Sequence, residues 1–431
     1  MRYTDLTDYI EIVPAEHPVN AEIRVPGSKS ITNRALVLAA LADGTSTLEN
    51  ALFSDDSAVC AESLRRLGIG VEEDRTAERF IVHGQGGRLP NSKADCFVGN
   101  SGTTARFLVA AAALGTGAYR FDGVARMRQR PISGLLSALR GLGANFRFEV
   151  EADHFPLTVL GQGLRGGRVS LEATDSSQFV TALLQVAPYA EQDVQITLVG
   201  EVVSEPYIEM TLKVMAQFDV SADKVDYRNY FIRSGQKYRA QTYFIEPDAS
   251  NATYFFAAAA LTNGRVRVPY LNADSLQGDA HFVDVLEQMG CTVYRGADYL
   301  EVHGTDRLRG IEIDLNAMSD TSQTLAAIAP FATAPVTIRN IGHNRLKETD
   351  RISAVAVELR KLGAKVDELP DGLVIYPSTL HGAAIDTYDD HRMAMAFAVI
   401  GLRQPGVRIN NPNCTAKTFP DYFTRFQQLY G

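Results

Sequence analysis

The sequence has no tryptophan and few cysteines among its 431 residues. The cysteines are far apart and form no CxxC pair, which argues against a zinc site and a disulfide framework; they are Cys60, Cys96, Cys291 and Cys414. Apolar runs such as residues 35–42 are far shorter than a membrane span. The first ten residues, MRYTDLTDYI, carry acidic residues where an export signal needs an apolar core. We therefore expect a cytoplasmic protein with no membrane partner.

An excess of basic residues is also missing. The chain has 42 basic and 51 acidic residues, a formal net charge of -9 and a pI near 5.5, which argues against a nucleic-acid partner. Hydrophobic residues make up 45% of the chain and charged residues 22%, as is typical of a folded α/β protein. A chain of this length exceeds the size at which a single hydrophobic core stops growing, so we expect two domains.

A helix ending recurs along the chain. The segments LRRLG, LRGLG, LEQMG and LRKLG end at Gly68, Gly143, Gly290 and Gly363, and a weaker copy has Asp219 at the same position. Successive positions lie 71 to 76 residues apart. Glycine, and less readily aspartate, suits a left-handed helix C-cap. The pattern predicts equivalent helix-to-strand turns.

Polar clusters that open Ala-rich helices interleave with these turns. They are marked by Ser30, Ser101, Ser176, Ser250, Thr321 and His391, spaced 70 to 75 residues apart. Six units of strand, helix, strand, helix, strand then fill the chain, with coincidental spacing as the alternative. The N-terminal strand YIEIVPA has no unit of its own, so we expect it to complete the sixth.

Three units per domain divide the chain between residues 240 and 248. The predicted domains are residues 22–244 and, for the second, residues 1–21 together with residues 245–431. The chain then crosses twice between domains, which predicts a hinge over a cleft.

Lys29 and Arg34 lie at the start of a predicted helix in VPGSKSITNRALVLAALA, residues 25–42. A helix N-terminus is the positive end of the macrodipole, so cations there are disfavoured unless an anion binds among them. A Walker motif is excluded, because Ile23 stands where its first glycine is required and Ser28 precedes the lysine. An anion site and an ordinary capped helix with both cations in solvent remain as interpretations.

The starts of the equivalent helices are predicted to point to a common region. The candidate groups there are Lys29, Arg34, Asn100, Ser101, Gly102, Ser176, Ser177, Gln178, Asp320, His391 and Arg392. Hydroxyls, amides, free backbone N–H groups and cations suit a phosphate or oxyanion site. N-capping alone would explain the SSQ segment. The recurrence of such polar clusters at equivalent helix starts favours an anion-binding site.

Further cations lie at the starts of the other predicted helices, which alternate with the Ala-rich helices along the chain. RMRQRPI contains Arg130, HNRLKETDRI contains Lys347, Glu348 and Arg351, and CTAKTFPDYF contains Lys417. Lys347 and Arg351 are four residues apart and are predicted to share one helical face. A basic surface loop and a solvated charge ladder are the alternatives for the first two segments. These cations suit a small polyanionic substrate, and the candidate acid/base groups are Asp320, Glu348 and Lys29.

Eight motifs occur in order along nearly the whole chain: PGSKSITNRAL, GNSGTTARFL, RMRQRPI, DSSQF, SEPYI, LKETDRI, DDHRMAMAF and CTAKTFPDYF. Together they resemble the 3-phosphoshikimate 1-carboxyvinyltransferase (5-enolpyruvylshikimate-3-phosphate synthase) family. The resemblance implies an α/β fold of two domains, each with three inverted βαβαββ units in a pseudo-threefold arrangement and with the active site in the interdomain cleft. It also implies a monomer that joins shikimate 3-phosphate to phosphoenolpyruvate without a cofactor.

The resemblance assigns residues to both substrates. For shikimate 3-phosphate they are Lys29, Ser30, Arg34, Ser176, Ser177, Gln178, Ser204, Tyr207, Asp320 and Lys347. For phosphoenolpyruvate they are Lys29, Gly102, Arg130, Gln178, Arg351, Arg392 and Lys417. The chain departs from the family where Phe107 replaces a common proline, and the family's substrate-binding asparagine falls at His343 or Asn344.

The resemblance also implies catalytic roles. Asp320 accepts the proton of the attacking 5-hydroxyl, Glu348 protonates the phosphoenolpyruvate methylene, and Lys29 assists proton transfer and stabilises the departing phosphate.

Three other functions are considered. The sister enzyme that acts on UDP-N-acetylglucosamine has Lys-Asn where this chain has Lys29 and Ser30, and a cysteine in the RMRQRPI loop, whereas no cysteine lies between Cys96 and Cys291. RNA 3′-terminal phosphate cyclases share the βαβαββ unit, but the acidic pI argues against RNA binding. A non-catalytic anion-binding relative is disfavoured because Asp320 and Glu348 are present.

Overall fold

The structure is a computed structural model that describes residues 8–172, 176–200 and 202–430. The chain divides into two compact units. One is Gly27–Ile245, called here the 27–245 unit; the other combines Met1–Pro26 with Glu246–Gly431 and is called the split unit. Within the described ranges, a search for a helix with the length and apolar character of a membrane span finds none.

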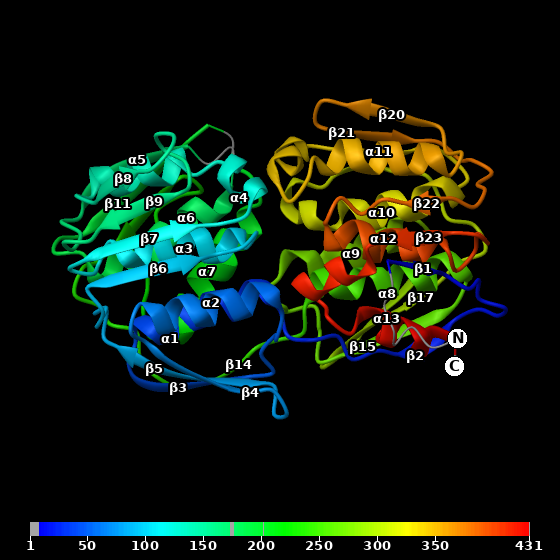
Figure 1. The fold of residues 1–431 in the computed structure, drawn as a ribbon. Helices are drawn as coiled ribbons and strands as arrows, with labels where there is room; N and C mark the ends of the chain where they lie inside the picture. The colour runs from blue at the N-terminus through cyan, green and yellow to red at the C-terminus, as the bar shows by residue number, and fades with distance from the viewer. Residues whose placement is uncertain (1–7, 173–175, 201, 431) are drawn as a thin grey trace. The chain divides into compact units, whose positions relative to one another are not determined.

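The sheets of the 27–245 unit share one strand order in its described residues: a parallel pair, then two antiparallel strands. Most of these strands are labelled in Figure 1. They are β14 (Thr242–Phe244), β3 (Asp43–Glu49), β5 (Arg79–Gln85) and β4 (Gly70–Asp74); β6 (Lys93–Phe97), β7 (Ala118–Asp122), β9 (Leu157–Leu160) and β8 (Asn145–Phe148); and β10 (Gly167–Glu172), β11 (Val194–Val199), β13 (Asn229–Ile232) and β12 (Asp223–Lys224). A parallel pair cannot be joined by a tight turn, and in the second and third sheets it is joined through a helix.

In the described strands of the split unit, two sheets repeat this order, and the third has a parallel pair followed by one antiparallel strand. Its sheets are β2 (Asn20–Glu22), β15 (Arg265–Pro269), β17 (Tyr299–His303) and β16 (Thr292–Arg295); β18 (Glu312–Asp314), β19 (Val336–Arg339), β21 (Gly372–Ile375) and β20 (Val366–Leu369); and β22 (Ala384–Ile385), β23 (Arg408–Asn410) and β1 (Tyr9–Glu11). β1 pairs antiparallel with β23, Tyr9 opposite Asn410. The prediction that the N-terminal strand completes the sixth unit is confirmed.

Besides β1, two further strands pair with partners far away in the sequence. β2 lies beside β15, with Asn20 opposite Arg265, and β14 lies beside β3, with Thr242 opposite Thr47. Each is the first strand of a βαβαββ module whose remaining elements come from a distant part of the chain. The two connections between the units follow directly after β2 and β14.

The first helix of each module is almost completely buried. These helices are α1 (Lys29–Leu41), α3 (Gly102–Ala112) and α6 (Ser177–Val186) in the 27–245 unit, and α8 (Ala249–Thr262), α10 (Ser322–Ile328) and α12 (His391–Ile400) in the split unit. Every residue of α3, α10 and α12 is buried. Because a helix buried on all sides must be apolar on all sides, the Ala-rich runs form the interior of each unit. The polar clusters predicted to open them do lie at their starts.

The remaining α-helices are more exposed. They are α2 (Asp55–Arg66), α4 (Ala125–Gln129), α5 (Ser133–Gly141), α7 (Glu205–Gln217), α9 (Phe282–Gln288), α11 (Arg351–Lys361) and α13 (Tyr422–Phe426). After α2, α5, α9 and α11 comes a left-handed glycine, at Gly68, Gly143, Gly290 and Gly363, with φ between 92° and 106°. Asp219, after α7, has φ 64°. The predicted turns are therefore confirmed, including the one that uses aspartate.

Candidate active site

The inner helices of the 27–245 unit begin with serine caps. The hydroxyl oxygens of Ser28, Ser101 and Ser176 each accept a hydrogen bond from a backbone N–H in the first turn of α1, α3 and α6, at 3.2 to 3.4 Å. Capping satisfies one of the first four N–H groups of a helix. The capping interpretation is therefore correct for these three serines.

Three residues predicted to bind phosphoenolpyruvate meet at the start of α3. A Cβ added to Gly102 would lie 2.6 Å from Nη2 of Arg130 and 3.0 Å from Oε1 of Gln178. The Arg130 guanidinium donates from Nη1 to the backbone and side-chain oxygens of Asn100, at 3.0 and 3.3 Å. Arg130 is only 5% exposed, so the interpretation of RMRQRPI as a solvated basic loop is wrong for this residue.

Arg34 is enclosed by the protein. Its guanidinium donates to the hydroxyls of Thr181 and Thr211, at 3.3 and 2.8 Å, and to the carbonyls of Ser30 and Tyr207, at 2.9 and 3.1 Å. It also lies over the ring of Phe107, 5.4 Å from the centroid. Burial lowers the pKa of Arg34 to about 10. The interpretation of Arg34 as a solvated cation is therefore wrong.

Lys29 and Ser204 lie close to other helix starts in the same unit. Lys29 Nζ lies 3.9 Å from Oδ2 of Asp56, in the first turn of α2. Asp56 is a partner that the sequence analysis missed, since its position in LFSDDS indicates only a helix start. Ser204 precedes α7 in a left-handed conformation, with φ 54°, and is buried; Tyr207 in the first turn is half-buried.

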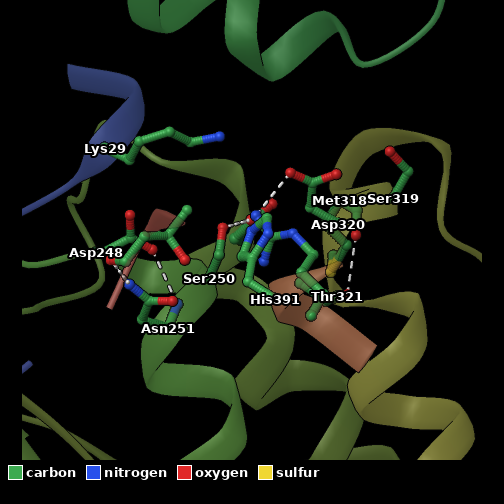
Figure 2. Close-up of polar contacts among 12 residues, drawn as sticks. Lys29, Asp248, Ser250, Asn251, Met318, Ser319, Asp320, Thr321 and His391 are labelled. Atoms are coloured by element: carbon green, nitrogen blue, oxygen red, sulfur yellow. Dashed lines mark hydrogen bonds and ion pairs between the residues drawn. The ribbon is translucent and has the colours of Figure 1, made fainter. Parts of the chain in front are cut away.

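In the split unit, the starts of α8, α10 and α12 surround Asp320. Figure 2 shows Asp320 with the neighbouring helix starts at Ser250, Thr321 and His391. Asp320 lies in the 3-10 helix η3 (Asn316–Thr321), directly before α10. Its Oδ1 accepts from Nη1 of Arg351 at 3.0 Å and its Oδ2 from Nη2 of Arg392 at 2.7 Å. Both carboxylate oxygens are therefore held by guanidinium groups.

Arg351 connects three carboxylates. Besides Asp320, it donates to Oε2 of Glu348 at 2.9 Å and, from Nε, to Oδ2 of Asp390 at 2.8 Å. Arg351 is 2% exposed. Burial opposes its charge, but Asp390, Glu348 and Asp320 together raise the pKa of Arg351, so it is a permanent cation.

Lys347 and Glu348 lie outside the helix that the sequence analysis predicted for them. α11 begins at Arg351, because the Asp350 side chain caps it by accepting from the Ser353 N–H at 3.1 Å. The prediction that Lys347 and Arg351 share one helical face is therefore wrong. Glu348 instead reaches its partners from an irregular segment, and its Oε1 lies 3.8 Å from Nζ of Lys417.

The two candidates for the substrate-binding asparagine position both contact Ser319. His343 Nε2 lies 2.8 Å from the Ser319 hydroxyl oxygen, and Asn344 Nδ2 donates to the Ser319 carbonyl at 2.9 Å. Asn344 is completely buried, whereas His343 is 7% exposed. Burial, with a further contribution from Lys347, lowers the pKa of His343 to about 3, so its imidazole is neutral at physiological pH.

Other polar residues of the cluster were not predicted. Asp390 is completely buried, caps α12 through the Arg392 N–H at 3.0 Å, and also accepts from Arg351. The Tyr254 hydroxyl accepts from Nη1 of Arg392 at 3.2 Å. An aspartate directly before HRMAMAF is a capping signal, so Asp390 was detectable. Tyr254 comes from an apolar helix face and carried no such signal.

The two sets of groups differ in charge. In the split unit, the carboxylates of Asp320, Glu348 and Asp390 hold the cations Arg351, Arg392 and Lys417. In the 27–245 unit, Arg34 and Arg130 are buried but donate to uncharged groups. A buried cation is costly unless an anion balances it. This second set therefore has the character of an anion site.

The fold matches that of solved enolpyruvyl transferases. The EPSP synthase from Acinetobacter baumannii matches with a TM-score of 0.81 at 24% identity, covering 98% of both chains. The enolpyruvyl transferase NikO from Streptomyces tendae matches with a TM-score of 0.79 at 18% identity, covering 98% of this chain and 97% of NikO. At these identities the similarity establishes the fold.

Sequence comparison defines the family more closely. The family model for EPSP synthase (3-phosphoshikimate 1-carboxyvinyltransferase) matches residues 13–426. Proteins named 3-phosphoshikimate 1-carboxyvinyltransferase from Trichormus variabilis and a Nostoc species are 53% and 54% identical, over 424 and 422 residues. The alignments cover 98% of this chain and 100% and 99% of those proteins. The chain belongs to the EPSP synthase family.

Proposed function

We propose that this chain transfers the enolpyruvyl group of phosphoenolpyruvate to the 5-hydroxyl of shikimate 3-phosphate and releases phosphate. The family model and the full-length relatives support this reaction. The single observation that carries the residue assignment is the group formed by Arg130, Gly102 and Gln178. There a buried guanidinium with uncharged partners lies beside a glycine whose missing side chain leaves room, which suits a small anion.

Each substrate is assigned to a set of residues. Shikimate 3-phosphate is bound by Lys29, Ser30, Arg34, Ser176, Ser177, Gln178, Ser204, Tyr207, Asp320 and Lys347, and phosphoenolpyruvate by Lys29, Gly102, Arg130, Gln178, Arg351, Arg392 and Lys417. Arg34 donates to the Ser30 and Tyr207 carbonyls, so it also fixes two of the other proposed ligands. Phosphate and carboxylate groups with several negative charges match this excess of cations.

The first chemical step is addition. Asp320 accepts the proton of the 5-hydroxyl, whose oxygen attacks C2 of phosphoenolpyruvate, while Glu348 delivers a proton to C3. The methylene becomes a methyl group and C2 becomes a tetrahedral ketal that carries both the phosphate and the shikimate oxygen. Arg351 holds one oxygen of Asp320 and one of Glu348, so a single guanidinium orients the proposed base and acid.

The second step is elimination. The bond from C2 to the phosphate oxygen breaks, the methyl group returns one proton to Glu348, and the new double bond forms. Lys29, Arg130 and Arg392 stabilise the departing phosphate by charge, as pre-positioned cations do best at a site with little water. Each acid/base group then regains its starting protonation after the 5-hydroxyl proton is passed from Asp320 to solvent or phosphate.

The assignment is tested by measuring phosphate release from phosphoenolpyruvate with three acceptor conditions: shikimate 3-phosphate, UDP-N-acetylglucosamine and no acceptor. We expect release with shikimate 3-phosphate alone, and a product whose mass is that of shikimate 3-phosphate plus one enolpyruvyl group. Release with UDP-N-acetylglucosamine instead would overturn the proposed acceptor. Release without an acceptor would identify a phosphatase rather than a transferase.

We also propose that the protein acts as a monomer in the cytoplasm. Its four cysteines are free and buried, which suits a reducing compartment. Light scattering of the purified protein across a tenfold concentration range tests the first part, with a constant mass equal to that of one chain as the expected result.

A further inference from the structure

The segment that leads into α12 has an unfavourable backbone conformation. Tyr388 and Asp389 are consecutive and both left-handed, with φ 54° and 56°. This region is sparsely populated by residues other than glycine, and least by bulky ones. Strained residues persist only where their surroundings hold them, and they concentrate at functional sites. The residues that follow are Asp390 and Arg392, which belong to the charged cluster.

Glu358 holds this turn from the neighbouring helix. It is completely buried on α11. Its Oε1 accepts from the Tyr388 hydroxyl at 2.6 Å, and its Oε2 accepts from the Asp386 backbone N–H at 3.1 Å. Lys361 Nζ lies 2.9 Å from Oε1 and balances the charge. The two carboxylate oxygens of Glu358 thus fix two points of the turn, one on each side of Thr387.

The same helix also fixes the end of the turn. Arg351, in the first turn of α11, donates to both carboxylate oxygens of Asp390, at 2.8 and 3.3 Å. Glu358 follows Arg351 by seven residues, which is two helical turns and places both side chains on one face. α11 therefore binds the turn near its start through Glu358 and at its end through Arg351.

We propose that Glu358 is a positioning residue for the reaction: with the Tyr388 hydroxyl, it sets the 386–390 turn that delivers Asp390 and Arg392 to Arg351 and Asp320. The inference rests on the proposed function, because Arg392 is assigned there to phosphoenolpyruvate. Glu358 acts on the substrate only through Arg392 and Asp390. Loosening the turn therefore weakens phosphoenolpyruvate binding more than shikimate 3-phosphate binding, since most of the residues assigned to the latter belong to the 27–245 unit.

Two variants test the proposal. Tyr388→Phe removes one hydroxyl from an exposed side chain, and Glu358→Gln keeps the shape of the side chain but loses one acceptor and the charge. For both we expect KM for phosphoenolpyruvate to rise about five- to tenfold, the loss of roughly one hydrogen bond, with KM for shikimate 3-phosphate changed less than twofold. We also expect faster amide hydrogen exchange at residues 388–392.

The matched control is Tyr376→Phe. The Tyr376 hydroxyl also donates to a carboxylate, Oδ2 of Asp367 at 2.8 Å, but in a surface contact between β20 and the residue that follows β21. The Tyr376→Phe variant should leave the KM values for phosphoenolpyruvate and shikimate 3-phosphate unchanged.

Equal changes in both KM values, or a lower melting temperature with neither KM changed, would overturn the proposal for Glu358. If the wild-type chain does not turn over these substrates, the proposed function fails. Hydrogen exchange at residues 388–392 then decides the positioning role alone: faster exchange in Tyr388→Phe supports it, and unchanged exchange contradicts it.

Discussion

Gly102 and Arg130 are so close that a single methyl group on the glycine would lie 2.6 Å from Nη2 of the guanidinium. Any side chain at this position must push Arg130 out of the place where Asn100 holds it. The position of Arg130 at the start of α3 therefore requires that residue 102 has no Cβ atom.

Gly102→Ala should impair phosphoenolpyruvate binding selectively. The overlap forces Arg130 to move by several tenths of an ångström, and overpacking of this kind costs about 1 to 3 kcal/mol, so KM for phosphoenolpyruvate should rise about tenfold or more. Steady-state kinetics with each substrate varied in turn measure this change in KM. The control is Gly134→Ala on α5, where the new Cβ would lie an ordinary 3.5 Å from Phe179. An unchanged KM in Gly102→Ala would show that Arg130 does not bind this substrate.

Asp320→Asn and Glu348→Gln should each lower kcat. Both variants keep an acceptor for the guanidinium groups but cannot exchange the proton that the mechanism requires, so we expect losses of about 10²- to 10⁴-fold. Asp314→Asn serves as the control, because Asp314 is an exposed residue at the end of β18. Single-turnover rates near the wild-type value in both Asp320→Asn and Glu348→Gln would remove these residues from the catalytic steps.

His343 should make the fold sensitive to acid. Burial lowers the pKa of His343 to about 3, against an ordinary value of 6.5, so the unfolded chain binds a proton between these pH values and the folded chain does not. Stability from this residue is therefore complete above pH 6.5 and falls as the pH drops towards 3. At pH 5 the loss is about 2 kcal/mol relative to pH 7.

The comparison with His343→Gln isolates this contribution. Urea unfolding at pH 7 and at pH 5 should show that the variant loses about 2 kcal/mol less than the wild-type protein over this interval. Equal losses in the two proteins would mean that His343 is protonated equally in both states, contrary to its buried position.

Phe107→Leu should destabilise the 27–245 unit. The Phe107 ring supports the Arg34 guanidinium at 5.4 Å, and a desolvated cation–π contact contributes roughly 1 to 2 kcal/mol. Phe179→Leu, at a completely buried phenylalanine on α6, is the control for the loss of ring volume. We expect the melting temperature to fall further in Phe107→Leu. Equal melting temperatures would mean that the ring supports Arg34 only by packing.

The modules could be predicted from the sequence because their signals are local and repeated. Gly68 and its counterparts mark left-handed turns, and even Asp219 fits the pattern, since aspartate tolerates this conformation. The place of β1 was predicted because the last helix of the sequence has no strand after it, while the N-terminal strand has no unit of its own. The repeated signals thus predicted a topology that the sequence of a single module would not have predicted.

The contacts between modules could not be predicted in the same way. The start of α11 depends on Asp350 capping at Ser353, which competes with the run of helix-forming residues before it. The burial of Arg34 depends on hydroxyls far away in the sequence, Thr181 and Thr211. Glu358 looks like an ordinary charge on the exposed side of a helix, and its role becomes visible only once the turn at Tyr388 lies beside it.

The central claim is that the enolpyruvyl group is transferred by protonation of the methylene, attack at C2 and elimination of phosphate. Mass spectrometry of the product formed in D₂O tests it most directly. Protonation turns the methylene into a methyl group that contains a solvent hydrogen, and elimination then removes one of its three hydrogens. We expect the product to be shikimate 3-phosphate with an added enolpyruvyl group that carries solvent deuterium. Phosphate release without that product, or the product without deuterium, would contradict the account.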